Sequence, residues 1–276
     1  MPLSCPAIDY GDRLRAGVLI PSGNSVAEPE LRAMLPFGSS MLVTRLPLLG
    51  SSRPELIGMM DHLETASKLL ADAKVDVIVF HCTAVSTFAP DLAQGIRERI
   101  ENATGIRSFT TADAILNALT QLDAKRVSLL TPYIDEVHAR EAAFLQANGI
   151  IIEGGANLGI NTNTEMASLQ PEAIFDWARE NGRNSADACF LSCTAIKSAA
   201  IIERLEQVLD MPVITSNQSM AWHLIRSSNI AGGIKGFGRL FKSNEADTAT
   251  TTAAAPSEIS EQSIRRSGLK TQQSAK

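Results

Sequence analysis

A repeat of short segments limits the folds open to this chain. FHCTAV (80–85) resembles LSCTAI (191–196), and the cysteines within them, Cys82 and Cys193, lie 111 residues apart. Two further pairs of segments recur in the same order: VLIPS (18–22) with SLLTPY (128–133), whose prolines are also 111 residues apart, and SFTTADAILNAL (108–119) with VITSNQSMAWHL (213–224), at an offset of 105. Strand-to-helix turns share composition, so similar strand ends alone would also fit unrelated units. The shared Cys-Thr-Ala triplet and the equal offsets favour a gene duplication with two similar halves.

Short apolar runs alternate with helical patterns along the chain. Seven runs rich in β-branched residues predict strands, at 15–22, 40–48, 75–82, 126–133, 149–158, 186–193 and 211–217. Helical patterns lie between or after them, at 54–74, 91–105, 114–125, 135–149, 173–182, 199–209 and 220–233. Continuous apolar runs are typical of strands buried on both faces of a parallel sheet, and their alternation with helices indicates an α/β protein.

The repeat and the alternation together predict the domain organisation. We expect an α/β fold of two similar flavodoxin-like halves with parallel sheets, related by pseudo-twofold symmetry, with the active site in the cleft between them. The N-terminal half spans 15–125, with 211–241 packing across onto it, and the C-terminal half spans 126–235. The segment 243–276 is rich in Ser, Thr, Ala and Gln, so we expect it to be disordered or loosely ordered.

Composition and missing motifs exclude several classes of function. A net charge of −5 and an aromatic content of 5% argue against nucleic-acid binding, which favours basic patches and stacking rings. No apolar run is long enough to cross a membrane and the N-terminus lacks a signal-peptide core, so we expect a cytoplasmic protein with no membrane partner. The four histidines are scattered, and no dinucleotide-binding or phosphate-binding glycine motif occurs. We therefore expect no metal and no cofactor, and the sequence leaves open whether the chain is a homo-oligomer.

Cys82 and Cys193 are the strongest candidates for catalysis. Ligands of parallel α/β proteins bind beyond the carboxyl ends of the strands, and both cysteines lie at such ends. Each precedes Thr-Ala, which predicts a turn into a helix whose free amides bind anions and lower the pKa of a thiol, giving a thiolate near neutral pH. A single buried cysteine is more often a core residue, as we expect for Cys189 and for unpaired Cys5. Two cysteines at equivalent positions favour a pair in which one attacks carbon or removes a proton and the other supplies one.

Further candidates surround the two cysteines at the strand ends. They are Pro21, Ser22 and Asn24 after the first strand, Thr83 and Ala84 after Cys82, Tyr133 after the fourth strand, Asn163 in GINTNTE, and Thr194 after Cys193. Tyr133 follows Thr-Pro at a strand end, where its hydroxyl would reach a ligand, although a packing role is the alternative. Asn24 is equally well a turn residue, and Asn163 equally well a helix N-cap.

Several separated segments resemble a known family. YIDEVHAREAAFL (133–145), NLGI (157–160), the LSC segment (191–193) and GFGRLF (236–241) look especially close to arylmalonate decarboxylase. Over about residues 15–241 the chain resembles the aspartate/glutamate racemase superfamily, in its maleate isomerase and arylmalonate decarboxylase branch. The decarboxylase has glycine at the position of Cys82, whereas the isomerases and racemases have both cysteines.

The resemblance implies a role for each candidate. Cys82 would add to a substrate double bond and Cys193 would act as acid and base. The groups implied to hold the substrate carboxylates are Asn24, Tyr133, Asn163 and backbone amides near Thr83, Ala84 and Thr194. The sequence of the second half is more similar to the decarboxylase, which leaves the identity of the substrate open.

The sequence therefore predicts an enzyme acting on a small carboxylate. The leading hypothesis is a cofactor-independent isomerase of a small dicarboxylate, converting maleate to fumarate or performing a racemase-type 1,1-proton transfer. The alternative is an arylmalonate-type decarboxylase in which Cys193 protonates an enediolate. A non-catalytic dicarboxylate-binding protein is the third hypothesis.

Overall fold

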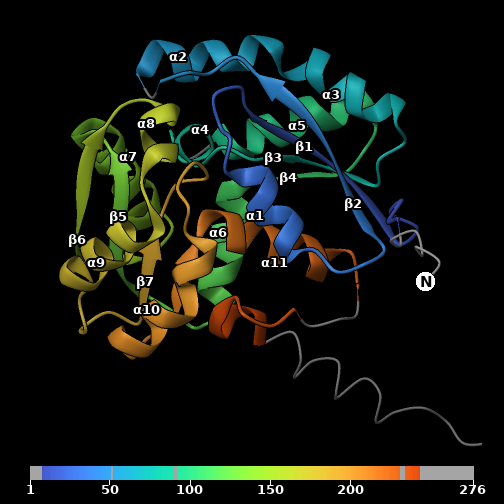
Figure 1. The fold of residues 1–276 in the computed structure, drawn as a ribbon. Helices are drawn as coiled ribbons and strands as arrows, with labels where there is room; N and C mark the ends of the chain where they lie inside the picture. Colours follow the sequence, from blue (N-terminus) through green and yellow to red (C-terminus); the bar gives the residue numbers. More distant parts are fainter. Residues whose placement is uncertain (1–7, 51, 90–91, 231–233, 243–276) are drawn as a thin grey trace, which may run out of the picture.

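The computed structural model describes residues 8–50, 52–89, 92–230 and 234–242, which form an α/β protein with two four-stranded sheets (Figure 1). The first sheet has the strand order β2-β1-β3-β4. Its strands are β1 (Leu14–Pro21), β2 (Ser39–Leu46), β3 (Val77–Phe80) and β4 (Ser108–Thr110). Every pairing between them is parallel.

The second sheet repeats the topology of the first. Its strands are β5 (Arg126–Tyr133), β6 (Ile151–Ile160), β7 (Ala188–Leu191) and β8 (Val213–Thr215), in the order β6-β5-β7-β8 and all parallel. In each sheet the first strand of the half lies between the second and the third, and the fourth lies outside the third. The predicted α/β class with two similar parallel sheets is thereby confirmed.

Helices connect the strands in both halves. They are α1 (Ala27–Met34), α2 (Arg53–Gly58), α3 (Leu63–Asp72), α4 (Thr83–Ser86), α5 (Leu92–Thr104), α6 (Thr111–Gln121), α7 (Asp135–Ala147), α8 (Asn163–Ser168), α9 (Pro171–Asn181), α10 (Ile202–Leu209) and α11 (Ser216–Ser227), with 3-10 turns η1 (Met59–His62) and η2 (Ala199–Ile201). No helix among the described residues is long and apolar enough to cross a membrane.

The repeat-equivalent helices α6 and α11 join the two halves. Each begins with a capping box, in which the side chain of Thr110 or Thr215 accepts a hydrogen bond from the amide three residues later, and the side chain of that later residue accepts one from the threonine amide. The two helices pack against each other in the middle of the molecule, and α11 also packs against α1 (Figure 1). Of the predicted segment 211–241, residues 213–215 add β8 to the second sheet, and residues 216–227 form α11, which packs against α6 and α1 of the first half.

The structure corrects several predicted elements. The strands predicted at 75–82 and 186–193 end at Phe80 and Leu191, two residues before the cysteines, because the chain turns away from the sheet there. The predicted helix over 54–74 is divided into α2, η1 and α3. Helix α1 and the three-residue strand β4 have too few residues for a clear periodic pattern, and the sequence did not predict them. The predicted tail at 243–276 and Cys5 lie outside the described residues.

Candidate active site

Cys82 lies at the N-terminus of the short helix α4, beyond the end of β3. Its backbone is extended, with φ −149°, and its side chain is buried. The backbone amides of Ala84 and Val85 interact with the sulfur and favour its ionised form. In this half the predicted turn into a helix is confirmed, because the residue after Cys82 is the first of α4.

Cys193 lies at the equivalent place beyond β7, but its backbone is different. Its φ is +104°, a conformation that costs a side-chain-bearing residue about 1–3 kcal/mol and that clusters at functional sites. Thr194 and Ala195 form a turn, and the next helical residue is Ala199 of η2. The predicted helix N-terminus directly after Cys193 is therefore wrong. One amide replaces it, since Ala195 donates a hydrogen bond to the Cys193 sulfur over 3.2 Å.

One hydroxyl connects the two cysteine loops. Ser216, the first residue of α11, accepts a hydrogen bond from the Thr83 hydroxyl over 2.9 Å and another from the Cys193 amide over 3.0 Å. Both cysteine loops are thus held by the same buried atom. The electrostatic influence of Cys193 on the pKa of Cys82 is consistent with two thiols that share one site.

Tyr133 completes the group around the sulfur atoms. It is buried at the end of β5, and its hydroxyl forms a hydrogen bond with the Cys193 thiol that favours the thiolate. Burial raises the pKa of Tyr133 well above its ordinary value, and the neighbouring acids Cys193, Glu141 and Cys82 raise it further. The phenol therefore stays protonated and acts as a hydrogen-bond donor in this site.

Burial makes both thiols weaker acids than the sequence predicts. It raises the pKa of Cys82 to about 12 and that of Cys193 to about 12, and the nearby amides offset only part of this rise. The predicted thiolate near neutral pH is therefore wrong for the protein by itself. The physical reason is that desolvation penalises a buried thiolate more than the two amides at Cys82, or the one amide and the Tyr133 hydroxyl at Cys193, stabilise it.

Asn24 connects the two halves through its side-chain amide. Its oxygen accepts hydrogen bonds from the amides of Val26 and Ala27 at the start of α1. Its nitrogen donates to the carbonyl and to the hydroxyl of Thr194, each over 3.0 Å. All four hydrogen-bonding positions of the side chain are occupied, so Asn24 holds the loop after Cys193 and would have to exchange a bond to hold a carboxylate.

The other predicted binding residues lie around a second contact between the halves. The Ser22 hydroxyl accepts a hydrogen bond from the Leu48 amide over 3.1 Å, and Pro21 is buried at the end of β1. Asn163 donates its side-chain nitrogen to the Leu48 carbonyl over 3.2 Å. Asn163 is the first residue of α8 and Thr162 is the N-cap, so the N-cap alternative for Asn163 is wrong. Ser22 and Asn163 therefore both hold the loop after β2.

A buried network that the sequence analysis missed lies behind the cysteine loops. Asn217 accepts a hydrogen bond at its oxygen from the protonated Nε2 of His81, over 2.8 Å, and donates to Glu30 over 2.7 Å and to the Thr194 carbonyl over 3.3 Å. Burial lowers the pKa of His81 to about 4 and raises that of Glu30. The repeat alignment hinted at this network, because Asn217 follows the matched residue Thr215 and His81 precedes Cys82.

A second missed group lies beside Cys193. Glu141 of α7 is fully buried and accepts a hydrogen bond from the Ser192 hydroxyl over 2.6 Å. Met166 of α8 lies against the Cys193 sulfur, with 3.7 Å between the two sulfur atoms. The sequence did contain a signal for Glu141, because this glutamate lies on the apolar face of α7 between Val137 and Phe144.

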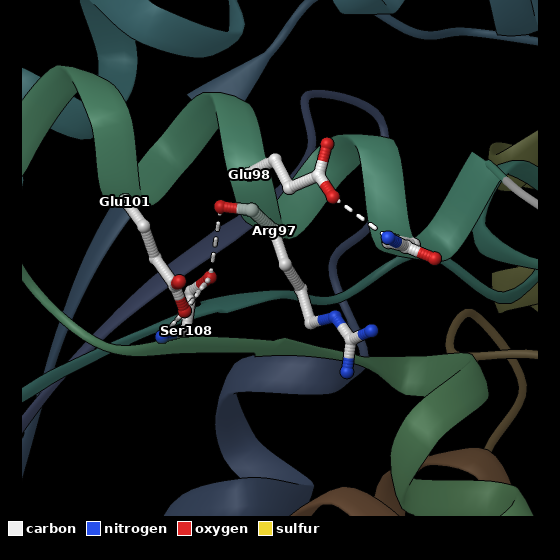
Figure 2. Close-up of a pocket in the computed structure, with 5 residues that line it drawn as sticks. Arg97, Glu98, Glu101 and Ser108 are labelled. Atoms are coloured by element: carbon white, nitrogen blue, oxygen red, sulfur yellow. Dashed lines mark hydrogen bonds between the residues drawn. The ribbon is translucent and has the colours of Figure 1, made fainter.

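A surface hollow of about 250 Å³ lies elsewhere, between α5 and β4 (Figure 2). Its polar side chains are already paired, as Gln94 binds Glu98, Ser108 binds Glu101 and Arg97 pairs with Asp113. It offers no group for a ligand comparable to the thiols. In the described parts of the chain, no cluster of three or more His, Cys, Asp or Glu side chains is arranged to hold a metal ion.

Comparison with known proteins identifies the family of the chain. The family model described as arylmalonate decarboxylase matches residues 16–241. The maleate isomerase of Nocardia farcinica is 30% identical over 251 residues, which cover 86% of this chain and 98% of that protein. The arylmalonate decarboxylase of Bordetella bronchiseptica is 30% identical over 234 residues, covering 77% and 93%.

A solved structure extends the likeness to the fold. The Nocardia farcinica maleate cis-trans isomerase, as a cysteine-to-serine mutant with a covalently bound succinylcysteine intermediate, superimposes with a TM-score of 0.79 at 26% identity, over 83% of this chain and 98% of that one. The range matched by the family model, 16–241, includes both Cys82 and Cys193. The chain therefore belongs to the arylmalonate decarboxylase and maleate isomerase family of the aspartate/glutamate racemase superfamily.

Proposed function

We propose that this protein is a cofactor-independent isomerase of a small dicarboxylate, with maleate to fumarate as its reaction. The observation that carries the proposal is the pair of buried thiols, Cys82 and Cys193, held by one serine hydroxyl and lying within the range of each other's charge. A decarboxylase that protonates from one face needs only one of them. The succinylcysteine described for the Nocardia farcinica relative supports covalent addition by a cysteine.

The residues suggest an order of events. Cys82 releases its proton to solvent as its sulfur attacks, and the amides of Ala84 and Val85 stabilise the thiolate. The sulfur forms a bond to one alkene carbon, and the electron pair of the double bond moves to the other carbon and its carboxylate as an enediolate. Cys193, supported by the Tyr133 hydroxyl, protonates that carbon.

The central bond of the resulting succinyl thioether is single and rotates. Cys193 then removes the proton, the carbon–sulfur bond breaks, and the trans alkene leaves with the Cys82 thiolate restored. Because the thiols are buried and neutral, substrate binding and proton transfer must together produce the reactive thiolate. The rate at which a thiol-alkylating reagent modifies the free protein is therefore a poor measure of its activity.

The test follows maleate and fumarate by proton NMR with the purified protein. We expect fumarate to form, and we expect Cys82→Ala and Cys193→Ala each to lower the rate by about 10³-fold or more. Cys189→Ala is the matched control, because Cys189 is a buried cysteine in β7 with an equally high pKa and is expected to be silent. Absence of fumarate with the intact protein would reject maleate as substrate.

The second candidate is an arylmalonate-type decarboxylase, favoured by the family model and by 30% identity to the Bordetella bronchiseptica enzyme. One carboxylate leaves as CO2, its bonding electrons form an enediolate, and the Cys193 thiol protonates the carbon. Full activity of Cys82→Ala on phenylmalonate, with Cys193→Ala inactive, would support it.

A racemase-type 1,1-proton transfer uses the same two cysteines. One removes and the other returns an α-proton on the opposite face. Incubating the protein with aspartate or glutamate in D2O distinguishes this reaction from the other two, because deuterium then enters at the α-carbon while the carbon skeleton is unchanged. If the protein binds dicarboxylates but converts none of these substrates, the result would support a non-catalytic binding protein.

A further inference from the structure

Glu141 is a buried acid for which the proposed reaction has no role. It lies on the inner face of α7 with none of its surface exposed. One carboxyl oxygen accepts the hydrogen bond from Ser192, and the other has no partner among the described residues. A buried carboxyl with one unpaired oxygen is costly to retain, and such groups concentrate at functional sites.

The groups that face Glu141 belong to the candidate site. Its charge acts on Tyr133 at the end of β5, on Cys82 beyond β3 and on Cys193 beyond β7, and it raises the pKa of each of these acids. The Ser192 hydroxyl that binds it precedes Cys193 directly. Glu141 therefore shares its surroundings with the sulfur atoms between which a substrate would lie.

No cation compensates Glu141 within the described chain. On its own helix, the His138 ring bonds the Thr131 hydroxyl, and the guanidinium of Arg140 lies over the Phe88 ring. On β6, which packs against α7, the acid Glu153 is paired with Arg126. An ionised Glu141 is thus an isolated, buried negative charge.

We propose that Glu141 is a proton-binding site linked to substrate, so that the protein takes up a proton on this carboxyl when a dicarboxylate binds. The inference rests on the proposed function, because it assumes a dianion between the two cysteines. Two substrate carboxylates beside an ionised Glu141 would place three negative charges together at low dielectric. Protonation of Glu141 removes one of them.

The pKa of Glu141 places its ionisation near neutral pH, where it can be coupled to substrate binding. Burial raises the pKa of Glu141 to about 7, so protonated and ionised forms coexist in the free protein. In the free protein the two thiols, with pKa values of about 12, do not change charge in that range. Binding of a dianion favours the protonated form, and by linkage a protonated Glu141 favours the dianion.

The test uses succinate, a saturated dicarboxylate that cannot isomerise. Calorimetric titration at about pH 8, in two buffers of different ionisation enthalpy, counts the protons bound, and we expect the uptake to approach one per site. The dissociation constant should rise up to about tenfold for each pH unit above about 7. Glu141→Gln should abolish the uptake and flatten this dependence, whereas Glu136→Gln, which removes an exposed acid of the same helix, should leave both unchanged.

A second variant keeps the test decisive if Glu141→Gln does not fold. Ser192→Ala removes the hydrogen bond that favours the ionised carboxyl, and it should move the onset of the pH dependence to higher pH. An unmoved onset would overturn the inference. Succinate binding without proton uptake overturns the inference alone, whereas failure of succinate and maleate to bind at any pH overturns the proposed function together with it.

Discussion

The loops after β3 and β7 occupy equivalent places in two similar sheets, yet they differ in backbone and in surroundings. Cys82 has an extended backbone and begins a helix, whereas Cys193 has φ +104° and begins a turn. Two amides approach the Cys82 sulfur, and one amide and the Tyr133 hydroxyl approach that of Cys193. Each of the two similar halves supplies one thiol, and the different loops give each its own hydrogen-bond partners.

The residue before each cysteine shows how the difference arises. In the first half it is His81, a large side chain whose two nitrogens bond Thr111 and Asn217. In the second half the equivalent residue is Ser192, whose small hydroxyl binds Glu141 instead. The first half therefore places a buried neutral base behind its cysteine, and the second half places a buried acid. Such pairs of groups with pKa values moved apart are typical of acid–base sites.

Of the residues that distinguish the two halves, Asn217 should reduce the free energy of unfolding most when it is replaced by alanine. Asn217→Ala removes one buried hydrogen bond from each of His81, Glu30 and the Thr194 carbonyl, so we expect a loss of about 4 kcal/mol in the free energy of unfolding. Its repeat counterpart in the first half is Ala112, which has no such network. Urea denaturation measures the effect, with Asn117→Ala on the exposed side of α6 as a control that should cost under about 0.5 kcal/mol. A loss of similar size in both variants would show that the network is not what joins the halves.

The two buried titratable groups should give stability opposite dependences on pH. His81 has its folded pKa lowered from 6.5 to about 4, so its contribution is present above pH 6.5 and is lost as the pH falls through 4. Glu141 has its folded pKa raised from 4.5 to about 7, so its contribution is present below pH 4.5 and is lost as the pH rises through 7. Each change amounts to about 3 kcal/mol.

Variants separate these two opposing trends. Relative to the parent protein, Glu141→Gln should gain stability as the pH rises from about 4.5 to 7, and His81→Gln should gain it as the pH falls from about 6.5 to 4. Free energies of unfolding across this range, taken as differences from the parent, remove the contributions of other groups. Parallel profiles for the two variants would contradict the contrast between a buried base and a buried acid.

Glycine and alanine should rank in opposite orders at the two cysteine positions. At position 193 the positive φ favours glycine, so Cys193→Gly should be more stable than Cys193→Ala by about 1 kcal/mol. At position 82 the extended backbone suits any residue, and Cys82→Gly should be less stable than Cys82→Ala by about 0.5–1 kcal/mol. Thermal unfolding of the four variants measures both differences. The same order at both positions would mean that the two loops are not distinguished by backbone strain.

Much of the fold was predictable because it depends on local pattern. The apolar runs gave seven of the eight strands, and the repeated Cys-Thr-Ala segments indicated two similar halves. Strand β4 and helix α1 were missed because three and eight residues show little periodicity. Among the site residues, Cys82, Cys193 and Tyr133 were found at strand ends, where chain topology alone brings side chains together.

The sequence by itself thus determined the α/β class, the two similar halves and the pair of cysteines, since these follow from periodicity and spacing along one chain. Only the tertiary structure decided how those cysteines are held and charged. Contacts across the halves, such as Asn24 with Thr194, join residues 170 positions apart. Burial, which no local pattern fixes, reversed the predicted direction of the thiol pKa values and made Glu141 a titrating group.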